Sequence, residues 1–524
     1  MPKRSPIWPV IFCCLPLCGG CLSSSRLDTV VQRTLTREAG ADVAASSNSV
    51  ADAFAGRAPT NELPTAIELD APSVLRLATR YSRALQTQRE QLYLSGVATL
   101  ATRRDFGPQC SGTLEYLFAH NDDGTDLHTL TASLKASQIL PTGGTLSLSG
   151  QGHRPTTGSA SNNTATTTYD STASVELRQP LLAGAGYTAS HERAIQAEQD
   201  LMYALRGFAL SRQDFAISIL TTYYNLLMQK AVLANTRLNV QQSAFLRRRS
   251  EAMFKIRLAP ALDVMRAQQQ ELSASNSLSM AESDFDVALN RFLVQLGVPP
   301  TPRVTMTGTV PELRPVALAP AQGLALALTR RLDLLTARDR VADAARRLRT
   351  ARQNLLPQAD AFGRADYTAP AADALTAQDY EQNLSAGVTL QLPLDQRAER
   401  DAVKKAALAL DAARRDLDEK QDTIRVEISE SFRRLETQAL SAQIEARNTD
   451  LAKRRADYAV LRFKNGEVSN RDVVEAQTEL LNARNAYVQA LVAYELQRLQ
   501  LLRDVGLLDV AADGMWIERA PPGA

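Results

Sequence analysis

The sequence predicts a mainly α-helical protein with a smaller β portion, built from one unit that occurs twice: helix, strands, long helix, helix. Three observations predict this fold class. Two stretches of nearly 70 residues lack proline and almost lack glycine, and the whole chain of 524 residues holds only 25 Gly and 23 Pro. The two halves also carry matching landmarks, which align at a constant offset of 209 between 253–297 and 462–506. Globular helices average about 11–12 residues, so a compact domain is excluded unless the long stretches break.

The N-terminus has the pattern of a bacterial export signal. A short positive region precedes an apolar stretch, 7–17, that is too short to span a bilayer, which needs roughly 20 apolar residues. Small residues then precede Cys21, as in the lipoprotein box whose cysteine is acylated; an ordinary cysteine-rich signal peptide is the alternative. We expect a signal peptide over 1–20, lipidation at Cys21 and a tether over 21–65. Export would leave Cys110 without a disulfide partner.

The two halves carry the same landmarks in the same order. At an offset of 209, Asp263 aligns with Asp472 and Gly297 aligns with Gly506. Ordered similarity of this kind indicates a duplicated unit. The expected boundaries are a first repeat over 66–298, a connector over 299–316, a second repeat over 317–508 and a tail over 509–524.

A helix and a group of strands are expected to open each repeat. Residues 73–106 and 320–356 have apolar positions at three- and four-residue steps, which predicts a helix in each repeat. Segments within about 111–178 and 358–394 then alternate apolar with small polar residues, as the wall of a barrel with a wet lumen does. A soluble hairpin with one buried face would give the same alternation in any single strand.

A long helix and a returning helix are expected to complete each repeat. The long helices should cover about 188–257 and 396–464, or roughly 100 Å each at 1.5 Å per residue. Their narrow apolar seams among charged residues are typical of coiled-coil packing. Tight turns lead from them to the returning helices, 261–297 and 470–506.

Composition and motifs argue against several classes of function. Lys and Arg (59) nearly balance Asp and Glu (57), without the basic excess typical of nucleic-acid binders, so no nucleic-acid partner is expected. The four histidines lack metal-ligand spacing, so no metal site is expected. A secreted hydrolase would need a catalytic constellation, and neither a Ser/His/Asp arrangement, a P-loop nor a Gly-rich dinucleotide turn is recognisable. We therefore expect no enzyme, no catalytic residue and no cofactor.

The turn before the last helix carries a family signature. Residues 462–469 read RFKNGEVS and are followed by Asp472-Val473 and Ala476-Gln477. This pattern resembles the helix-turn signature of the TolC family of bacterial outer-membrane efflux and secretion channels. The first repeat keeps much of the signature, with Arg257 and Pro260 in place of the glycine and the serine.

The resemblance implies a homotrimer whose chains together close one outer-membrane β-barrel, which continues into an α-helical barrel across the periplasm. Physical reasoning agrees, because one chain has too few strands to close a barrel and an open sheet edge is not tolerated in lipid. The family usually offers two strands per repeat, whereas 111–178 has room for four. The extra hairpin would lie either in the barrel or outside it.

The implied function is the passive exit duct of a tripartite efflux pump or a type I secretion system. Its partners would be outer-membrane lipid, a periplasmic adaptor protein and, through the adaptor, an inner-membrane transporter. A lipid-anchored periplasmic coiled-coil scaffold without a pore is the alternative. The scaffold would explain Cys21 and the long helices, but not alternating segments at matching points of both repeats.

By the same resemblance, acidic residues at the periplasmic tip line the constriction of the tunnel. Asp472 and Glu475 lie three residues apart, on one face of the returning helix, and Asp263 is the first-repeat equivalent of Asp472. Threefold symmetry would turn each acid into a ring that favours cations. Acids that merely stabilise a helix N-terminus would give the same pattern.

The resemblance also implies that the turns at the tips dock the adaptor. The adaptor-docking residues are expected to be Gly466, Val468 and Ser469 in the second repeat and Leu258, Ala259 and Pro260 in the first.

Overall fold

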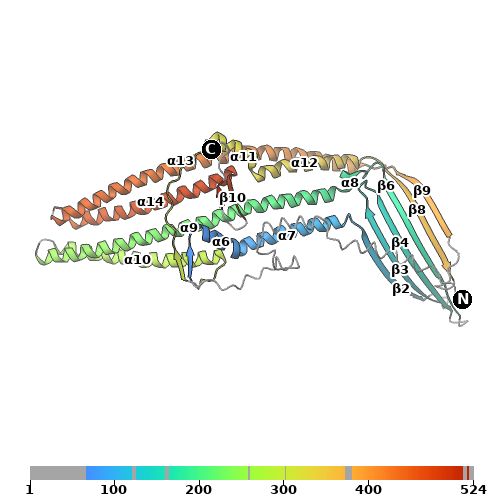
Figure 1. Ribbon diagram of the computed structural model, residues 1–524, viewed down its shortest axis with the longest axis horizontal. Coiled ribbons are helices and arrows are strands. Elements are labelled where there is room, and N and C mark those ends of the chain that lie inside the picture. Colours follow the sequence, from blue (N-terminus) through green and yellow to red (C-terminus); the bar gives the residue numbers. More distant parts are fainter. Residues whose placement is uncertain are drawn as a thin grey trace. The chain divides into compact units, whose positions relative to one another are not determined.

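A computed structural model describes residues 66–120, 125–159, 164–257, 260–300, 303–371, 381–465, 467–511 and 516–518. The fold divides into two compact units, whose elements are labelled in Figure 1. The sheet unit holds the described residues of 92–205 and 336–417, and the helical unit holds those of 36–91, 206–335 and 418–524. None of the described helices combines the length and the apolar composition that a membrane-crossing helix requires. The predicted signal peptide, Cys21 and the tether lie outside the described residues.

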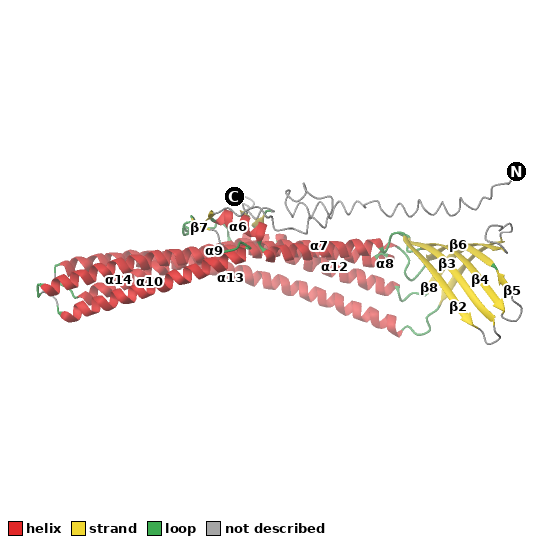
Figure 2. Ribbon diagram, turned by 90° about the horizontal axis from the view of Figure 1, so that it is seen from below, coloured by secondary structure: helices red, strands yellow, loops and turns green. Residues whose placement is uncertain are grey.

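Six long antiparallel strands form the sheet of the sheet unit (Figure 2). Their order is β2-β3-β4-β6-β8-β9, so the first repeat supplies four adjacent strands and the second repeat supplies two. The short β5, Thr164–Thr167, pairs only with the end of β4. The bounds of the six are β2 Gln109–His120, β3 Thr125–Ile139, β4 Thr145–Ser159, β6 Tyr169–Pro180, β8 Gln358–Ala371 and β9 Glu381–Gln391.

The helices of the two repeats match in length as well as in order. The first helices, α6 and α11, have 11 residues each, and α7 and α12 have 22 each. The long helices α9 and α13 have 64 and 68 residues, and the returning helices α10 and α14 have 36 each. The bounds are α6 Ala71–Tyr81, α7 Arg83–Arg104, α8 Tyr187–Ser190, α9 Glu192–Lys255, α10 Ala261–Leu296, α11 Pro320–Arg330, α12 Leu332–Gln353, α13 Arg397–Lys464 and α14 Asn470–Val505.

The single helices predicted over 73–106 and 320–356 are wrong, because each is broken into two. Ser82 and Arg331 adopt extended conformations, with ψ of 123° and 122°, at equivalent points of the two repeats. Neither break follows a proline or a glycine. In the first repeat, the end of α10 packs directly on the backbone at the break: a Cβ added to Gly297 would lie 2.0 Å from the Tyr81 carbonyl oxygen. The break coincides with this tertiary contact, and the periodicity of the sequence carries no information about such contacts.

Both returning helices end on a glycine in the left-handed region. Gly297 has φ of 82° and Gly506 has φ of 77°, and the amide of each donates to the last carbonyls of its helix. The following residue in each repeat donates to a carbonyl five residues back, at 2.9 Å from Val298 and 2.8 Å from Leu507. This is the Schellman arrangement, which glycine forms without the strain that a Cβ would cause. The two glycines aligned by sequence therefore perform the same task.

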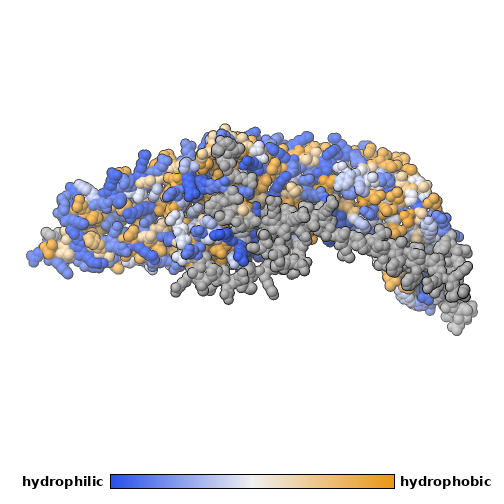
Figure 3. All heavy atoms as spheres, in the orientation of Figure 1, coloured by the Kyte–Doolittle hydropathy of each residue, from blue (hydrophilic) through white to orange (hydrophobic). Residues whose placement is uncertain are grey.

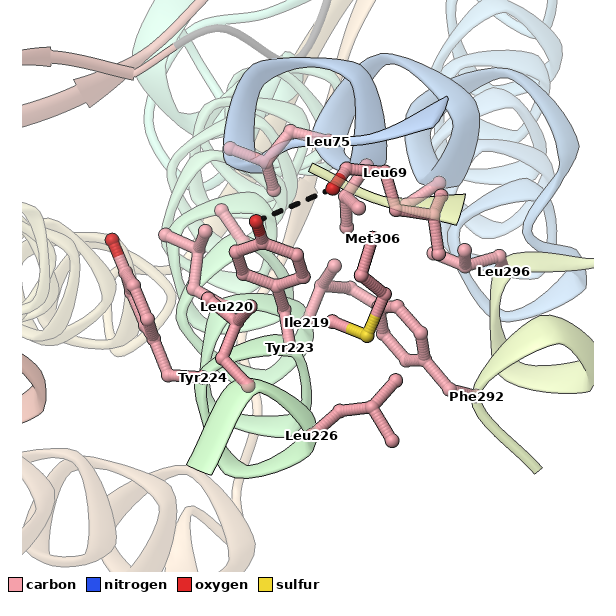
Figure 4. Close-up of a cluster of buried hydrophobic side chains, with 14 of the residues drawn as sticks. Leu69, Leu75, Ile219, Leu220, Tyr223, Tyr224, Leu226, Phe292, Leu296 and Met306 are labelled. Carbon is pink, nitrogen blue, oxygen red and sulfur yellow. Dashed lines mark hydrogen bonds between the residues drawn. The ribbon is translucent and has the colours of Figure 1, made fainter. Parts of the chain in front are cut away.

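The core of the helical unit gathers where its short and long helices meet (Figure 4). Leu75 of α6, Tyr223 of α9 and Phe292 of α10 are almost fully buried. The Tyr223 hydroxyl donates a long hydrogen bond, 3.5 Å, to the Leu69 carbonyl. Burial raises the pKa of Tyr223 to about 12, since the charged phenolate loses hydration, with a smaller contribution from the charge of Asp70.

The predicted connector and the region of the predicted tail contain short strands. Within the predicted connector, β7, Arg303–Met306, pairs in parallel with β1, Ala66–Leu69. Near the predicted tail, β10, Leu508–Val510, pairs with β11, Trp516–Glu518. Strands of three or four residues are too short to show a hydrophobic period, so the sequence gives no signal for them.

Gly297→Ala should destabilise the protein more than Gly506→Ala. Both substitutions force alanine into a left-handed conformation, at a cost of about 1 kcal/mol. Only at position 297 would the new Cβ also overlap a backbone oxygen; at position 506 the nearest atom is the Arg330 Cβ at 3.2 Å. Thermal unfolding followed by circular dichroism should show the larger drop for Gly297→Ala, and equal drops would contradict the packing described.

Tyr223→Phe should change how stability depends on alkaline pH. The folded-state pKa of about 12 lies above the unfolded value of about 10. The contribution of the neutral phenol is therefore complete below pH 10 and is lost as pH rises through 12. The variant should be less stable at pH 8 by about 1 kcal/mol, from the lost hydrogen bond, yet lose less stability between pH 10 and 12. Tyr187→Phe, at an exposed position, is the control, and parallel pH profiles for Tyr223→Phe and the native chain would refute the assignment.

Candidate functional site

The sheet has one apolar face that no described element of the sheet unit covers. Directly paired residues of neighbouring strands lie on the same face, and the register carries apolar residues across all six strands, as in the pair Tyr116 and Leu130 and the pair Leu148 and Val175. Many of these side chains are exposed, Leu114 to 75% and Leu384 to 80%. The large residues of this apolar face are Leu114, Tyr116, Phe118, Leu130, Leu134, Leu146, Leu148, Val175, Leu177, Tyr367, Leu384, Val388 and Leu390.

The opposite face of the sheet is mainly polar. Ser149 and Ser174 form a hydroxyl hydrogen bond of 2.6 Å across β4 and β6, and Arg364 contacts Asp366 at 2.8 Å along β8. The side chains of this polar face include Thr113, Glu115, Ser133, Lys135, Ser147, Ser149, Ser174, Glu176, Arg178, Asp360, Arg364, Asp366, Ser385 and Thr389. Large apolar residues interrupt it at Leu117, Leu127, Ile139 and Phe362. A sheet with one apolar and one polar face suits a wall between lipid and water.

Aromatic side chains flank the apolar face. Tyr116, Phe118 and Tyr367 lie toward the hairpin ends of their strands. At the other end, next to α8, His191 stacks between Phe106 and Tyr187, with ring centroids 4.8 Å and 4.6 Å away. Exposed amphipathic rings are Tyr116 at 65% and Tyr367 at 44% at the first border, and Tyr187 at the second. Such rings are of the kind found at membrane–water interfaces.

Asp472, one of the predicted gate acids, caps its own helix. The Ser469 amide and hydroxyl donate to Asp472 Oδ2 at 2.9 and 2.8 Å, where α14 begins. These hydrogen bonds hold the pKa of Asp472 below its ordinary value, the hydroxyl contributing most. The carboxylate is therefore ionised at neutral pH, and Ser469, a predicted docking residue, also has a local role in the cap.

Glu475, the second predicted gate acid, faces a cation that sequence reasoning missed. Arg455 of α13 contacts Glu475 at 3.4 Å and forms a closer ion pair with Glu479. All three side chains are about half exposed. Sequence could not find this pair, because Arg455 lies in a run of charged residues and only the packing of α13 on α14 selects it.

A buried amide links the two helix tips of the chain. The Asn470 side chain, fully buried at the start of α14, donates to the backbone carbonyl of Asp263 at 3.0 Å. Asp263 itself, near the start of α10, has a distant ion pair with Arg266 at 3.7 Å. The first repeat has Ala261 at the position equivalent to Asn470, so duplication gave no clue to this contact.

Only some of the predicted docking residues lie among the described residues. Leu258, Ala259 and Gly466 lie outside the described residues. Pro260 is exposed immediately before α10, and Val468 is half-buried against a cluster of Leu246, Phe463 and Val473.

The first-repeat turn has a non-glycine residue in the left-handed region. Arg257, the equivalent of Gly466 at the offset of 209, has φ of 59°. The nearby Phe254 is exposed to 47%, whereas its equivalent Phe463 is buried. The two tips therefore present different surfaces.

Two helices of the helical unit carry exposed apolar stripes. On α10, Met265, Leu272 and Met280 are followed by Val287 and Val294, at steps of seven or eight residues. The stripe of α13 consists of Leu440, Ile444, Leu451, Tyr458 and Leu461. Apolar residues at seven-residue steps form the seams of coiled coils, so both stripes are suited to contact with further helices. Figure 3 shows apolar side chains exposed among hydrophilic ones on one face.

Comparison with known protein families finds a match within the second repeat. Residues 323–507 match the family model described as outer membrane efflux protein. No curated protein sequence matches the chain.

Solved outer-membrane channels share the fold of the chain. CusC has 13% sequence identity and a TM-score of 0.63, with 83% of this chain and 92% of CusC covered. CmeC of Campylobacter jejuni has 14% identity and a TM-score of 0.62, with 83% and 85% covered. VceC of Vibrio cholerae has 15% identity and a TM-score of 0.61, with 83% and 96% covered. The match of residues 323–507 to the outer membrane efflux protein model agrees with the family that the sequence resembles, and the solved channels share the fold of the chain.

Proposed function

We propose that the chain is the outer-membrane channel of a tripartite efflux pump or a type I secretion system, and that it acts as a trimeric passive exit duct. The observation that carries this proposal is the sheet with one exposed apolar face and one polar face. In water, the apolar face would leave a row of large side chains hydrated, at a cost of about 25 cal/mol per Å² of apolar area. In a barrel wall the same face contacts lipid and the polar face lines a wet lumen.

The two ends of the sheet support assembly with further copies of the chain. In the described sheet, β2 and β9 each pair on one side only. Unpaired backbone amides and carbonyls cost several kcal/mol each in hydrocarbon, so a wall in lipid has to close. The edge of β9 in one chain would pair with the edge of β2 in the next.

The helical unit supports the same assembly. Its stripes on α10 and α13 are exposed in the single chain. In a ring of three chains, the α10 stripe of one chain would pack against the α13 stripe of the next and form an α-helical barrel. In this proposal, the same neighbouring chains pair the sheet edges and cover the helix stripes.

At the periplasmic tip, we propose that Asp472, Glu475 and Asp263 form acidic rings. The local contacts of these acids determine how much negative charge each presents to the tunnel. Arg455 would reduce the charge that Glu475 presents to a passing ion, whereas Asp472 keeps its charge while it caps α14. The gate would therefore depend on a balance between acids and Arg455.

The remaining parts of the proposal concern partners and anchoring. The turns at Pro260 and around Val468 and Ser469, with Leu258, Ala259 and Gly466, would dock a periplasmic adaptor, which connects to an inner-membrane transporter. Acylation at Cys21 would anchor the chain in the outer membrane, with the helical portion in the periplasm. The scaffold alternative has no use for an exposed apolar sheet face.

An arginine on the apolar face should prevent assembly, whereas the same arginine next to it should not. Val388→Arg places a charge in lipid, at a cost of about 2–4 kcal/mol per chain near the bilayer centre, and three chains would each carry that cost. Thr389→Arg on the polar face is the matched control. Heat-modifiable trimer on a gel should be lost for Val388→Arg and kept for Thr389→Arg; equal amounts from both variants would favour the scaffold.

Ion selectivity should move in opposite directions when Arg455 or the acids are changed. Arg455→Ala frees Glu475 and Glu479, so cation selectivity in planar bilayers should rise. Asp472→Ala combined with Glu475→Ala should lower it and raise conductance. Arg454→Ala is the matched control, since Arg454 pairs with Asp450 on its own helix at 2.8 Å. Selectivity unchanged both in Arg455→Ala and in the double variant of the acids would remove these residues from the gate.

A further inference from the structure

The sheet contains more strands than the family resemblance implies. Two strands per repeat would give four per chain, but six long strands lie in one continuous sheet. The two additional strands belong to the first repeat, where β2, β3, β4 and β6 are adjacent and antiparallel. The sequence left open whether the extra hairpin lies in the wall of the barrel or outside it.

The middle strands of the first repeat have the same two faces as the rest of the sheet. On β3, Leu130 and Leu134 share the apolar face, and Ser133 and Lys135 the polar face. The register continues without interruption into β4 and from β4 into β6. A hairpin that lay outside the wall, in water, would have no reason to carry an apolar face in line with its neighbours.

The middle strands are also long enough to cross a bilayer. A membrane strand needs about 9–11 residues, and β3 and β4 have 15 each. Every wall strand must be paired on both sides, and β3 and β4 meet that condition inside the chain, since β3 pairs with β2 and β4, and β4 pairs with β3 and β6.

We propose that all six strands are wall strands, so that three chains close a barrel of eighteen strands. This inference rests on the proposed trimeric channel. Because six is even and all neighbours are antiparallel, β2 and β9 run in opposite directions, and the junction between two chains is antiparallel like every other pair. The partner at each sheet edge is a second copy of this chain.

The additional strands widen the barrel. With strands about 4.8 Å apart and tilted by about 40°, eighteen strands give a backbone diameter of roughly 36 Å, against roughly 24 Å for twelve. The lumen would be lined by the polar face, including Lys135 of β3 and Gln151 of β4, which twelve strands would exclude. The wall would therefore admit bulkier solutes than one of twelve strands.

Nitroxide labels at single cysteines test the placement of β3 and β4. The full-length protein with Cys110→Ser, which removes the cysteine of the described residues, is labelled at added cysteines and reconstituted in phosphatidylcholine vesicles. The labelled pairs are Leu134→Cys with Ser133→Cys on β3, and Leu148→Cys with Ser149→Cys on β4. The pair Leu384→Cys with Ser385→Cys on β9 is the control, and the Cys110→Ser chain without added cysteine measures background labelling.

If all six strands form the wall, collisions with oxygen should dominate over collisions with a water-soluble nickel chelate at positions 134, 148 and 384. The reverse should hold at positions 133, 149 and 385. Images of the same trimers should show a barrel of about 36 Å.

Two other results would each overturn a different claim. Water access at all four β3 and β4 positions, with alternation kept on β9 and a barrel of about 24 Å, would overturn the eighteen-strand inference and leave the channel intact. Loss of alternation on β9 as well would overturn the proposed channel itself.

Discussion

The exposed apolar face of the sheet is the constraint on which the rest of this structure depends. Thirteen large apolar side chains, supplied by every one of the six strands, share that face. Burying them within one chain would need a second layer, and the sheet unit provides none over Leu114 or Leu384, which remain largely exposed. In the proposed channel, lipid covers this face, and a sheet in lipid has to close on itself. The need for further copies of the chain follows from that closure.

In the helical unit, each repeat forms a pair of packed helices that also leaves apolar residues exposed. The two repeats have helices of similar length, and in the second repeat α13 and α14 pack through small residues, with Ala452 and Ala456 of α13 against Ala476 and Ala483 of α14. Small side chains allow close approach of the helix axes and leave the larger ones, such as Leu451 and Tyr458, on the outer stripe. The same repeat that builds a pair of helices therefore also leaves a seam for a neighbour.

Much of this architecture could be predicted from sequence, because it depends on local patterns. The absence of proline fixed α9 and α13 to within a few residues, and alternation located the long strands. The matching cap glycines, Gly297 and Gly506, followed from the offset of 209. What could not be predicted depends on tertiary contacts: the helix breaks at Ser82 and Arg331, the pairing of β1 with β7, and the inclusion of all strands of the first repeat in one sheet.

In the candidate gate, too, some residues could be predicted from sequence and others depend on tertiary contacts. Sequence located Asp472, Glu475 and Asp263 by resemblance, and their roles stay predictions. It could not locate Arg455, which becomes relevant only when α13 packs on α14, nor Asn470, whose amide reaches across to the other tip. Charge balance at the tip is thus a property of the packed helices rather than of either turn alone.

The symmetry and mass of the particle in lipid nanodiscs, determined by cryo-electron microscopy and mass photometry, test the central claim most directly. The account predicts a threefold particle of about three times the protomer mass, with β9 of each chain paired to β2 of the next in a closed barrel. A single chain whose sheet keeps both edges open would contradict it, and the apolar face would then need another explanation.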